Sequence, residues 1–400
     1  MKKWKHIDFI LFISPIILAA VGVLMVYSAS MVMVVVKYDL PSNYYLLQQL
    51  KWFVLGLLVL VFTTLFPYSK YKRLVKLIVL GTISLLIFVL FFGEVRNNAK
   101  SWIDLGFFNI QPSELTKLSV IIYLSAIYAK KENYIDNFNK AVLPPLIILV
   151  IMLGLILKQP DIGTASIIAF IGAAIIISSG IRFSHLLFLI LSGVVIVILA
   201  IPKLATEEVL SRFTGAFQPF DYPDSAGYHL IQSLIAIGTG GINGVGLGQG
   251  VQKLGYLMEA HTDFIIAVIG EELGFIGVGT VIALLTAIVL RGFYISRKCE
   301  DQFGSLLAIG IASMVGIQSF VNMGAASGLL PITGVTLPFI SYGGSSILVL
   351  MGAMGILNNI ALNVRFQESH QPIKQVIPDE VSNVHHLKPK GGKIWADQRK

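Results

Sequence analysis

Long apolar runs restrict the fold of this 400-residue chain more than any other feature of its sequence. A helix needs about 20 mainly apolar residues to cross the hydrocarbon core of a bilayer. Ten runs approach or exceed this length, near residues 9–29, 50–66, 74–92, 113–129, 141–157, 162–179, 184–201, 264–290, 306–326 and 345–363. We therefore predict an all-α polytopic membrane protein with ten transmembrane helices.

The small number of charges excludes most soluble classes of protein. Only 13% of the residues are Asp, Glu, Lys or Arg, whereas soluble chains carry about a quarter. This argues against a soluble enzyme, a coiled coil, a collagen-like fibre and a disordered scaffold. The one cysteine, Cys299, cannot form an intrachain disulfide or a cysteine zinc site. The net charge of +8 does not indicate a nucleic acid partner, because in a membrane protein the position of the basic residues matters more than their sum.

The distribution of basic residues predicts the orientation. With the N-terminus in the cytoplasm, 21 of the 30 Lys and Arg residues lie on the cytoplasmic side, as the positive-inside rule requires. Both termini are then cytoplasmic. Lys2, Lys3 and Lys5 resemble the start of a signal peptide, but the run that follows is longer than the core of about 7–15 apolar residues in such peptides. We interpret this run as a retained membrane anchor.

Three long loops face outward in this orientation. They span residues 94–112, 202–262 and 328–344, and the second is a large extracytoplasmic loop between helices 7 and 8. Loops of this length are usually functional or disordered, and their many aromatic residues argue against disorder. We therefore expect a multi-pass protein of the cell membrane with its active site on the extracytoplasmic side. We assign residues 1–366 to the membrane domain and residues 367–400 to a disordered cytoplasmic tail, which is either solvated or in contact with anionic lipid.

Ionisable side chains gather at the outward ends of the predicted helices. Glu114 and Lys117 are three residues apart and share one helix face, as a structural ion pair or as part of a site. Asp161 and the run His261–Asp263 precede two other helices, and the pair Glu271–Glu272 lies about two turns inside the eighth. Charges inside a span cost about 2.5–3.5 kcal/mol each, so they tend to be paired and to face a cavity. For the two glutamates we favour such a structural role over catalysis.

A glycine-rich run over residues 238–250 allows two interpretations. It contains neither G-x-G-x-x-G nor Gly-Lys-Ser/Thr, so a nucleotide-binding loop is not indicated. The glycines either let the backbone approach a ligand or a neighbouring helix closely, or they form a nest of N–H groups for a phosphate. The seven histidines show no metal-ligand spacing, and we predict no protein metal site.

Dispersed motifs resemble those of the SEDS family of bacterial membrane proteins, which shape, elongate and divide the cell. The resemblance runs from about residue 7 to residue 365. The motifs lie at residues 26–30, 100–106, 111–117, 159–164, 232–238, 259–265, 270–274 and 337–346. The most diagnostic are E-A-H-T-D-F-I at 259–265 and L-P-F-I-S-Y-G-G-S-S at 337–346.

The resemblance implies a ten-helix peptidoglycan glycosyltransferase. Such an enzyme polymerises lipid II, an undecaprenyl-pyrophosphate disaccharide-pentapeptide, into β-1,4 glycan strands by an inverting displacement at the outer membrane face. The implied partners are a class B penicillin-binding protein, which is the transpeptidase, and other divisome proteins. The chain is most similar to division-type members, which act in septal cell-wall synthesis, and an elongation-type or sporulation-type role is the alternative.

The same resemblance places the catalytic aspartate at Asp263, which we expect to act as a general base. Lys100, Lys117 and Arg212 are candidates to bind the pyrophosphate, and Trp102 either stacks on a sugar or anchors the membrane interface. The predicted substrate-binding residues are Lys100, Trp102, Gln111, Ser113, Glu114, Lys117, Gln159, Asp161, Arg212, His261 and Thr262. A divalent cation, Mg²⁺ or Mn²⁺, is compatible with a pyrophosphate leaving group, although the sequence shows no dedicated site.

Two other functions would use a similar membrane protein. A lipid II flippase or transporter should line a path through the bilayer midplane, typically between internal repeats, and we find no convincing repeat. A non-catalytic scaffold for the synthase would have no need of Asp263 and its neighbours.

Overall fold

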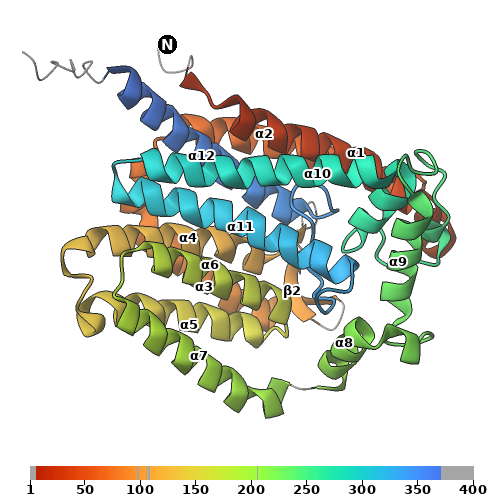
Figure 1. Ribbon diagram of the computed structural model, residues 1–400, viewed down its shortest axis with the longest axis horizontal. Helices are drawn as coiled ribbons and strands as arrows, with labels where there is room; N and C mark the ends of the chain where they lie inside the picture. The colour runs from red at the N-terminus through yellow and green to blue at the C-terminus, as the bar shows by residue number, and fades with distance from the viewer. Residues whose placement is uncertain (1–5, 97–98, 105, 107–108, 205, 371–400) are drawn as a thin grey trace, which may run out of the picture.

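The protein is a bundle of helices. The structure is a computed structural model that describes residues 6–96, 99–104, 106, 109–204 and 206–370. Figure 1 shows most helices side by side along one direction, with α8 and α9 at one end. The α-helices are α1 (Phe9–Tyr38), α2 (Tyr44–Leu65), α3 (Tyr71–Phe92), α4 (Pro112–Lys130), α5 (Leu143–Leu157), α6 (Ile162–Ser178), α7 (Phe183–Leu204), α8 (Glu207–Phe217), α9 (Tyr228–Gly240), α10 (Ile265–Lys298), α11 (Gln302–Ala326) and α12 (Gly344–His370). Short helical turns are η2 (Tyr68–Lys70), η3 (Glu132–Tyr134), η4 (Phe138–Val142), η5 (Pro219–Asp221) and η6 (Gln252–Leu254).

The predicted apolar runs all fall on helices. Each overlaps one of the helices α1 to α7 and α10 to α12, and α1, α2, α10 and α12 extend beyond their runs by six to nine residues. Seven helical stretches among the described residues are long and apolar enough to cross a membrane: Phe9–Tyr38, Tyr44–Leu65, Tyr68–Phe92, Phe138–Leu157, Ile265–Lys298, Gln302–Ala326 and Gly344–His370. α6 and the apolar part of α7 are shorter, and α4 carries Glu114 and Lys117 in its first two turns. A multi-pass helical protein is thus confirmed, and the count of ten spans stays a prediction.

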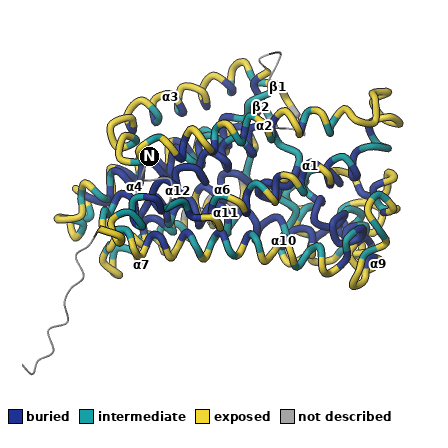
Figure 2. Tube along the Cα trace, turned by 90° about the horizontal axis from the view of Figure 1, so that it is seen from above, coloured by how far each residue is buried: buried dark blue, intermediate teal, exposed yellow. Residues whose placement is uncertain are grey.

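The outer surface of the bundle is apolar. Figure 2 shows that α3 and α7 are largely exposed, whereas the buried core lies along α11 and α12. Leu77 on α3 and Leu191 on α7 are 71% and 57% exposed. Soluble monomers rarely expose apolar patches of such extent, and the chains of a lipid bilayer are the surroundings that suit them.

Two of the predicted outward loops contain regular structure. Residues 94–112 include an antiparallel sheet of β1 (Glu94–Arg96), β2 (Ala99–Asp104) and β3 (Asn109–Ile110), in that order. The prediction of an entirely helical fold is therefore wrong for this segment. Short strands pair their backbone groups with one another and need no long apolar run, so a search for spans does not find them. Residues 202–262 hold α8, η5, α9 and η6 instead of one irregular loop.

The first and last helices of the membrane domain meet at the end of the bundle opposite α8 and α9 (Figure 1). The buried Asp8 caps the first turn of α1. Its Oδ2 accepts hydrogen bonds from Arg291 Nε at 2.6 Å and from Arg365 Nη2 at 2.7 Å, so the start of α1 is tied to α10 and α12. α12 continues to His370, past the predicted domain boundary at residue 366. Residues 371–400 of the predicted tail lie outside the described residues.

A methyl group at Gly240 is expected to destabilise the fold. Gly240 ends α9 against the backbone of α10, and a Cβ added there would overlap the carbonyl oxygen of Gly270. Overpacking of this kind costs about 1–3 kcal/mol, so Gly240→Ala should lower the melting temperature of the purified protein in detergent. Gly238→Ala on the same helix is the control, because a Cβ there meets no atom within 4 Å. Equal melting of the two variants would contradict the close approach of α9 and α10.

Candidate active site

One cavity, called here the central cavity, brings together most of the predicted site residues. Its volume is about 560 Å³, and it is lined by the first turns of α2, α4 and α6, by β2 and α8, and by residues between 259 and 263 and between 333 and 346. The predicted residues that line it are Trp102, Gln111, Glu114, Lys117, Asp161, Arg212, His261, Thr262 and Asp263. These residues come from five separate segments of the chain, so only the tertiary structure makes them neighbours.

Asp263 lies just before α10 and lines the central cavity. Its main-chain carbonyl accepts a hydrogen bond from Asn322 Nδ2 at 2.8 Å, which ties this segment to α11. Burial, followed by the negative charge of Glu259, raises the pKa of the Asp263 carboxyl to about 7, against the opposing effect of the Arg212 guanidinium. A carboxyl group with a pKa close to neutrality is suited to accept a proton at neutral pH.

Glu259 is a cavity residue that the sequence analysis did not select. Its backbone is left-handed, with φ of 53°, and its carbonyl accepts hydrogen bonds from the N–H groups of Thr262 at 3.1 Å and Phe264 at 3.3 Å. The Thr262 hydroxyl donates to Glu259 Oε2 at 2.7 Å. This turn presents Glu259, Thr262 and Asp263 to the central cavity together. A second carboxylate four residues before Asp263, inside the same motif, is the signal that would have identified it.

Asp161 joins the starts of α4 and α6. Its Oδ1 accepts a hydrogen bond from the Thr164 N–H at 3.0 Å, which caps α6. Its Oδ2 accepts from Gln111 Nε2 at 3.3 Å and from Ser113 Oγ at 3.2 Å. Ser113 is fully buried behind this contact, whereas Gln111 and Asp161 face the central cavity. Ser113 therefore supports the site from behind its wall.

Glu114 and Lys117 form a buried ion pair at the wall of the central cavity. Lys117 Nζ lies 2.7 Å from Glu114 Oε2 and donates to Gln318 Oε1 at 2.9 Å. Gln318 in turn donates to the Thr336 carbonyl at 3.0 Å. The pair thus links α4 to α11 and to the segment before α12, a geometry that favours the structural interpretation of these two charges.

Besides Ser113, two predicted residues do not line the central cavity. Lys100 Nζ donates to the Phe91 carbonyl at 2.9 Å, so the pairing of β2 directs this ammonium toward α3. Gln159 is fully buried, with its Nε2 3.5 Å from the Leu86 carbonyl. Neither belongs to the described residues that line the central cavity. Arg212 on α8 does line it and acts on the charge of Asp263, so among the three candidate cations it is the best placed for a ligand beside Asp263.

Aromatic side chains form another part of the wall. The ring of the buried His261 lies 4.8 Å from that of Tyr45, and burial lowers the pKa of His261. The imidazole is therefore neutral at neutral pH and packs against its neighbours. A stripe on α2 with a spacing of four residues also lines the cavity: Tyr44, Gln48 and Trp52. Polar and aromatic residues at this spacing, at the head of an apolar run, are a signal that the sequence analysis missed.

The glycine-rich run does not form a phosphate nest. The N–H groups of Gly248 in the run and of Val251 just after it donate to the carboxylates of Glu272 at 2.9 Å and Glu271 at 2.7 Å. Glu272 also binds the ammonium of the buried Lys253 at 2.6 Å. The nest interpretation is therefore wrong, because the Gly248 N–H is taken by a buried carboxylate and the Val245 and Gly246 N–H groups by main-chain carbonyls of α10. Glu271 and Glu272 serve as structural supports of the loop.

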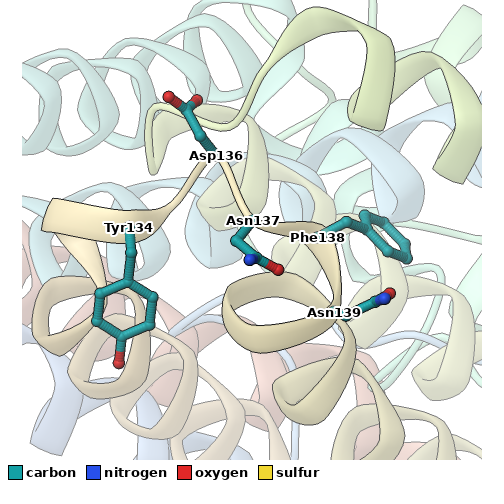
Figure 3. Close-up of a pocket in the computed structure, with 5 residues that line it drawn as sticks. All are labelled: Tyr134, Asp136, Asn137, Phe138 and Asn139. Atoms are coloured by element: carbon teal, nitrogen blue, oxygen red, sulfur yellow. The ribbon is translucent and has the colours of Figure 1, made fainter.

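A second hollow lies at the loop between α4 and α5 (Figure 3). It is lined by Tyr134, Asp136, Asn137, Phe138 and Asn139. Its carboxylate, Asp136, pairs with Arg182 at 2.6 Å, and none of the predicted site residues lines it. Within the part of the chain that the structure describes, no group of three or more His, Cys, Asp or Glu residues is arranged to hold a metal ion.

Comparison with known sequences agrees with the motifs. The family described as "Cell cycle protein", which groups FtsW, RodA and SpoVE, matches residues 8–366. The probable peptidoglycan glycosyltransferase FtsW of Bacillus subtilis (strain 168) is 47% identical over 386 residues, which cover 94% of this chain and 96% of that relative. Stage V sporulation protein E of the same organism is 40% identical over 365 residues, which cover 90% and 98%.

Solved structures share the fold. A chain from a peptidoglycan synthase complex that coordinates polymerization and crosslinking aligns with a TM-score of 0.73 and 26% identity, over 90% of this chain and 99% of that one. The rod shape determining protein RodA of Thermus thermophilus aligns with a TM-score of 0.64 and 26% identity, over 92% and 98%. With its motifs, its fold and this match along nearly its whole length, the chain belongs to the FtsW, RodA and SpoVE family, the SEDS family.

Proposed function

We propose that the protein polymerises lipid II into β-1,4 glycan strands for septal cell-wall synthesis in cell division. It is a peptidoglycan glycosyltransferase, which its family and its 47% identity to a probable peptidoglycan glycosyltransferase support. The observation that carries the mechanism is the Asp263 carboxylate, with its raised pKa, in a cavity that Arg212 also lines.

The proposed reaction is a single displacement that inverts the anomeric carbon of the donor. The 4-hydroxyl of the acceptor sugar attacks this carbon while the bond to pyrophosphate breaks. The hydroxyl proton passes to the Asp263 carboxylate, and the leaving pyrophosphate keeps the bonding electron pair. An α-linked donor thus gives a β-1,4 bond. A positioned general base contributes about 10²–10⁴ in rate.

Arg212 is the residue proposed to stabilise the leaving pyrophosphate. Arginine clamps are suited to this task because negative charge grows on the leaving oxygens in the transition state. Lys117 is a weaker candidate, since its ammonium is held by Glu114 and Gln318. Trp102 at the cavity wall offers an aromatic face to a sugar ring.

A divalent cation, Mg²⁺ or Mn²⁺, could be bound in the cavity by one carboxylate together with the pyrophosphate of the substrate. Magnesium is often held by one or two carboxylates together with the phosphates of a substrate, and Glu259 is an exposed carboxylate at the cavity. Glu259 would hold the ion, which would neutralise charge on the pyrophosphate when bound.

The proposed topology puts both termini in the cytoplasm and the central cavity on the extracytoplasmic side. The start of α1 and the end of α12 lie at the end of the bundle away from α8 and α9 (Figure 1), and the Asp8–Arg365 contact joins them. The positive-inside rule assigns this end to the cytoplasm. Lipid II would then reach the cavity from the outer leaflet. A class B penicillin-binding protein, with other divisome proteins, is the proposed partner, which the likeness to a chain of a peptidoglycan synthase complex supports.

Incubation of the full-length protein and its transpeptidase with labelled lipid II tests this proposal. Glycan strands should appear as a ladder on a gel. Movement of lipid II across vesicle membranes without any polymer would favour the flippase, and absence of both activities would favour a scaffold; either result would overturn the proposal.

Replacement of Arg212 by alanine is expected to slow polymerisation about a hundredfold, because the pyrophosphate loses a positive charge in the transition state. The same change removes the charge that lowers the pKa of Asp263, so the acid limb of the pH profile should move to higher pH. Steady-state rates between pH 5 and 9 measure both effects. Arg212→Lys is the matched control and should recover part of the rate, and a full rate in Arg212→Ala would exclude this role.

A further inference from the structure

The segment from Leu230 to Met258 has an unusual charge pattern for a loop outside the bilayer. One of its 29 residues, Lys253, is charged, whereas about a quarter of the residues in soluble chains are charged. Lys253 is 2% exposed and paired with the buried Glu272. The preceding residues 203–224, by contrast, carry six charges. The surface of residues 230–258, a stretch that the structure describes in full, therefore presents no net charge to its surroundings.

Most exposed side chains of this segment are apolar, and Thr239, Asn243 and Gln249 are the exposed polar ones. Ile242, Leu247 and Val251 are 69%, 57% and 52% exposed. Leu254 and Met258 are exposed to a similar extent. Contiguous exposed apolar residues mark contact with a membrane or with another protein.

The backbone of the loop is satisfied inside the protein. The N–H groups of Val245 and Gly246 donate to the main-chain carbonyls of Glu271 at 2.9 Å and Glu272 at 3.1 Å. The two carboxylates accept hydrogen bonds from three further N–H groups of the loop. Backbone groups that leave water must find such partners, because none is offered by lipid chains. Glu271 and Glu272 thus supply the hydrogen-bond acceptors that the backbone of an irregular segment needs when it is removed from water.

The apolar patch continues the lipid-facing surface of α10. The Phe275 and Ile276 N–H groups donate to the carbonyls of Gly241 and Ile242 at 2.9 and 3.2 Å, and the Phe275 side chain is 74% exposed. Phe275 lies 23 residues before Lys298, the last residue of α10, which is about 34 Å of helix at 1.5 Å per residue. The hydrocarbon core is about 30 Å thick. With Lys298 at one surface of the core, Phe275 and the patch beside it reach the other.

We propose that residues 241–258 form an interfacial membrane anchor, in which Ile242, Leu247 and Val251 insert among the lipid chains beside α10. The anchor lies at the boundary between headgroups and acyl chains, in the leaflet on the cavity side. That this leaflet is the outer one rests on the proposed function. Because the segment runs directly into Glu259 and Asp263, the anchor holds the cavity at the depth where the pyrophosphate of a membrane-borne substrate lies.

Fluorescence quenching of the full-length protein in vesicles tests the anchor. In a Cys299→Ser background, Leu247→Cys carries an environment-sensitive dye, and the vesicles contain phosphatidylcholine and phosphatidylglycerol with brominated acyl chains. Phe275→Cys is the lipid-facing reference. Asp224→Cys, an exposed position in the charged stretch, is the water-facing reference. Ile242→Cys provides a second position in the patch if Leu247→Cys does not fold.

The dye at position 247 should be quenched by brominated lipid about as strongly as at 275 and roughly threefold more than at 224, as insertion to the acyl boundary requires. Aqueous iodide should show the reverse order. Strong iodide quenching at position 247 would overturn the anchor. Shielding that develops only after addition of the transpeptidase would overturn it in favour of a protein-docking surface. The readout does not depend on polymerisation, so a failed glycan assay and a failed anchor are distinguishable.

Discussion

The Asp263→Asn variant is expected to lose polymerisation almost completely while it stays folded. Asparagine has nearly the shape of aspartate but cannot take a proton from the acceptor hydroxyl, so the contribution of the general base, about 10²–10⁴ in rate, disappears. The measurement is the yield of glycan strands from labelled lipid II with purified protein and its transpeptidase.

Asp104→Asn is the matched control for this loss. Asp104 lines the same cavity, but its Oδ1 accepts a hydrogen bond from the Gly106 N–H at 2.7 Å, and no step of the mechanism uses it. Its rate should stay close to that of the wild type. A wild-type rate in Asp263→Asn would remove the base from the mechanism.

The pH dependence gives a second readout for Asp263. Its pKa is raised to about 7, so the rate of the wild type should fall about tenfold for each pH unit below that value, as the carboxylate becomes protonated.

The free energy of unfolding changes with pH in the direction opposite to the rate. Ionisation of a carboxyl with a raised pKa costs the folded state free energy as the pH rises from the ordinary value toward 7. Asp263→Asn should therefore melt above the wild type at about pH 8, with a smaller difference near pH 4.

Lys253→Met is expected to destabilise the protein by about 3–5 kcal/mol, because it leaves the carboxylate of Glu272 buried without its cation. The two side chains are 1% and 0% exposed, with Nζ 2.6 Å from Oε1. Ser28 donates to both oxygens of the same carboxylate at 2.8 Å, and one hydroxyl cannot neutralise the charge. Unfolding in detergent by heat or denaturant measures the loss.

Two further variants test whether the loss of stability in Lys253→Met comes from a buried unpaired charge or from a general loss of packing. Lys253→Met combined with Glu272→Gln should regain much of the stability, because no isolated charge remains. Lys72→Met breaks a pair with Asp301 whose side chains are 43% and 40% exposed, and exposed pairs contribute about 0–1 kcal/mol. If Lys253→Met unfolds no more readily than Lys72→Met, the pair does not hold the loop.

The residues of the candidate active site differ in how readily the sequence identifies them. Asp263 is found through its motif, and Asp161 and Gln111 through theirs. Gln159 and Lys100 lie in equally clear motifs, yet their side chains turn toward the α3 region. A motif identifies which residues a family retains, but the direction of a side chain depends on the packing around it. Glu259 and the α2 stripe of Tyr44, Gln48 and Trp52 are the reverse case, since their place in the cavity requires contacts between distant segments.

The sequence alone determined the helical runs, because the thickness of a bilayer sets the length of apolar sequence that can cross it, and it determined the family through dispersed motifs. It could not determine the small sheet of residues 94–110, the helices α8 and α9, or the use of the glycine-rich run. The use of the glycine-rich run depends on hydrogen bonds between residues far apart, such as Gly248 with Glu272 and Phe275 with Gly241. The short strands and helices need no long apolar run, so a search for spans does not find them. Only the tertiary structure decided which polar groups meet, because each buried charge or N–H group must find a partner that sequence spacing does not specify.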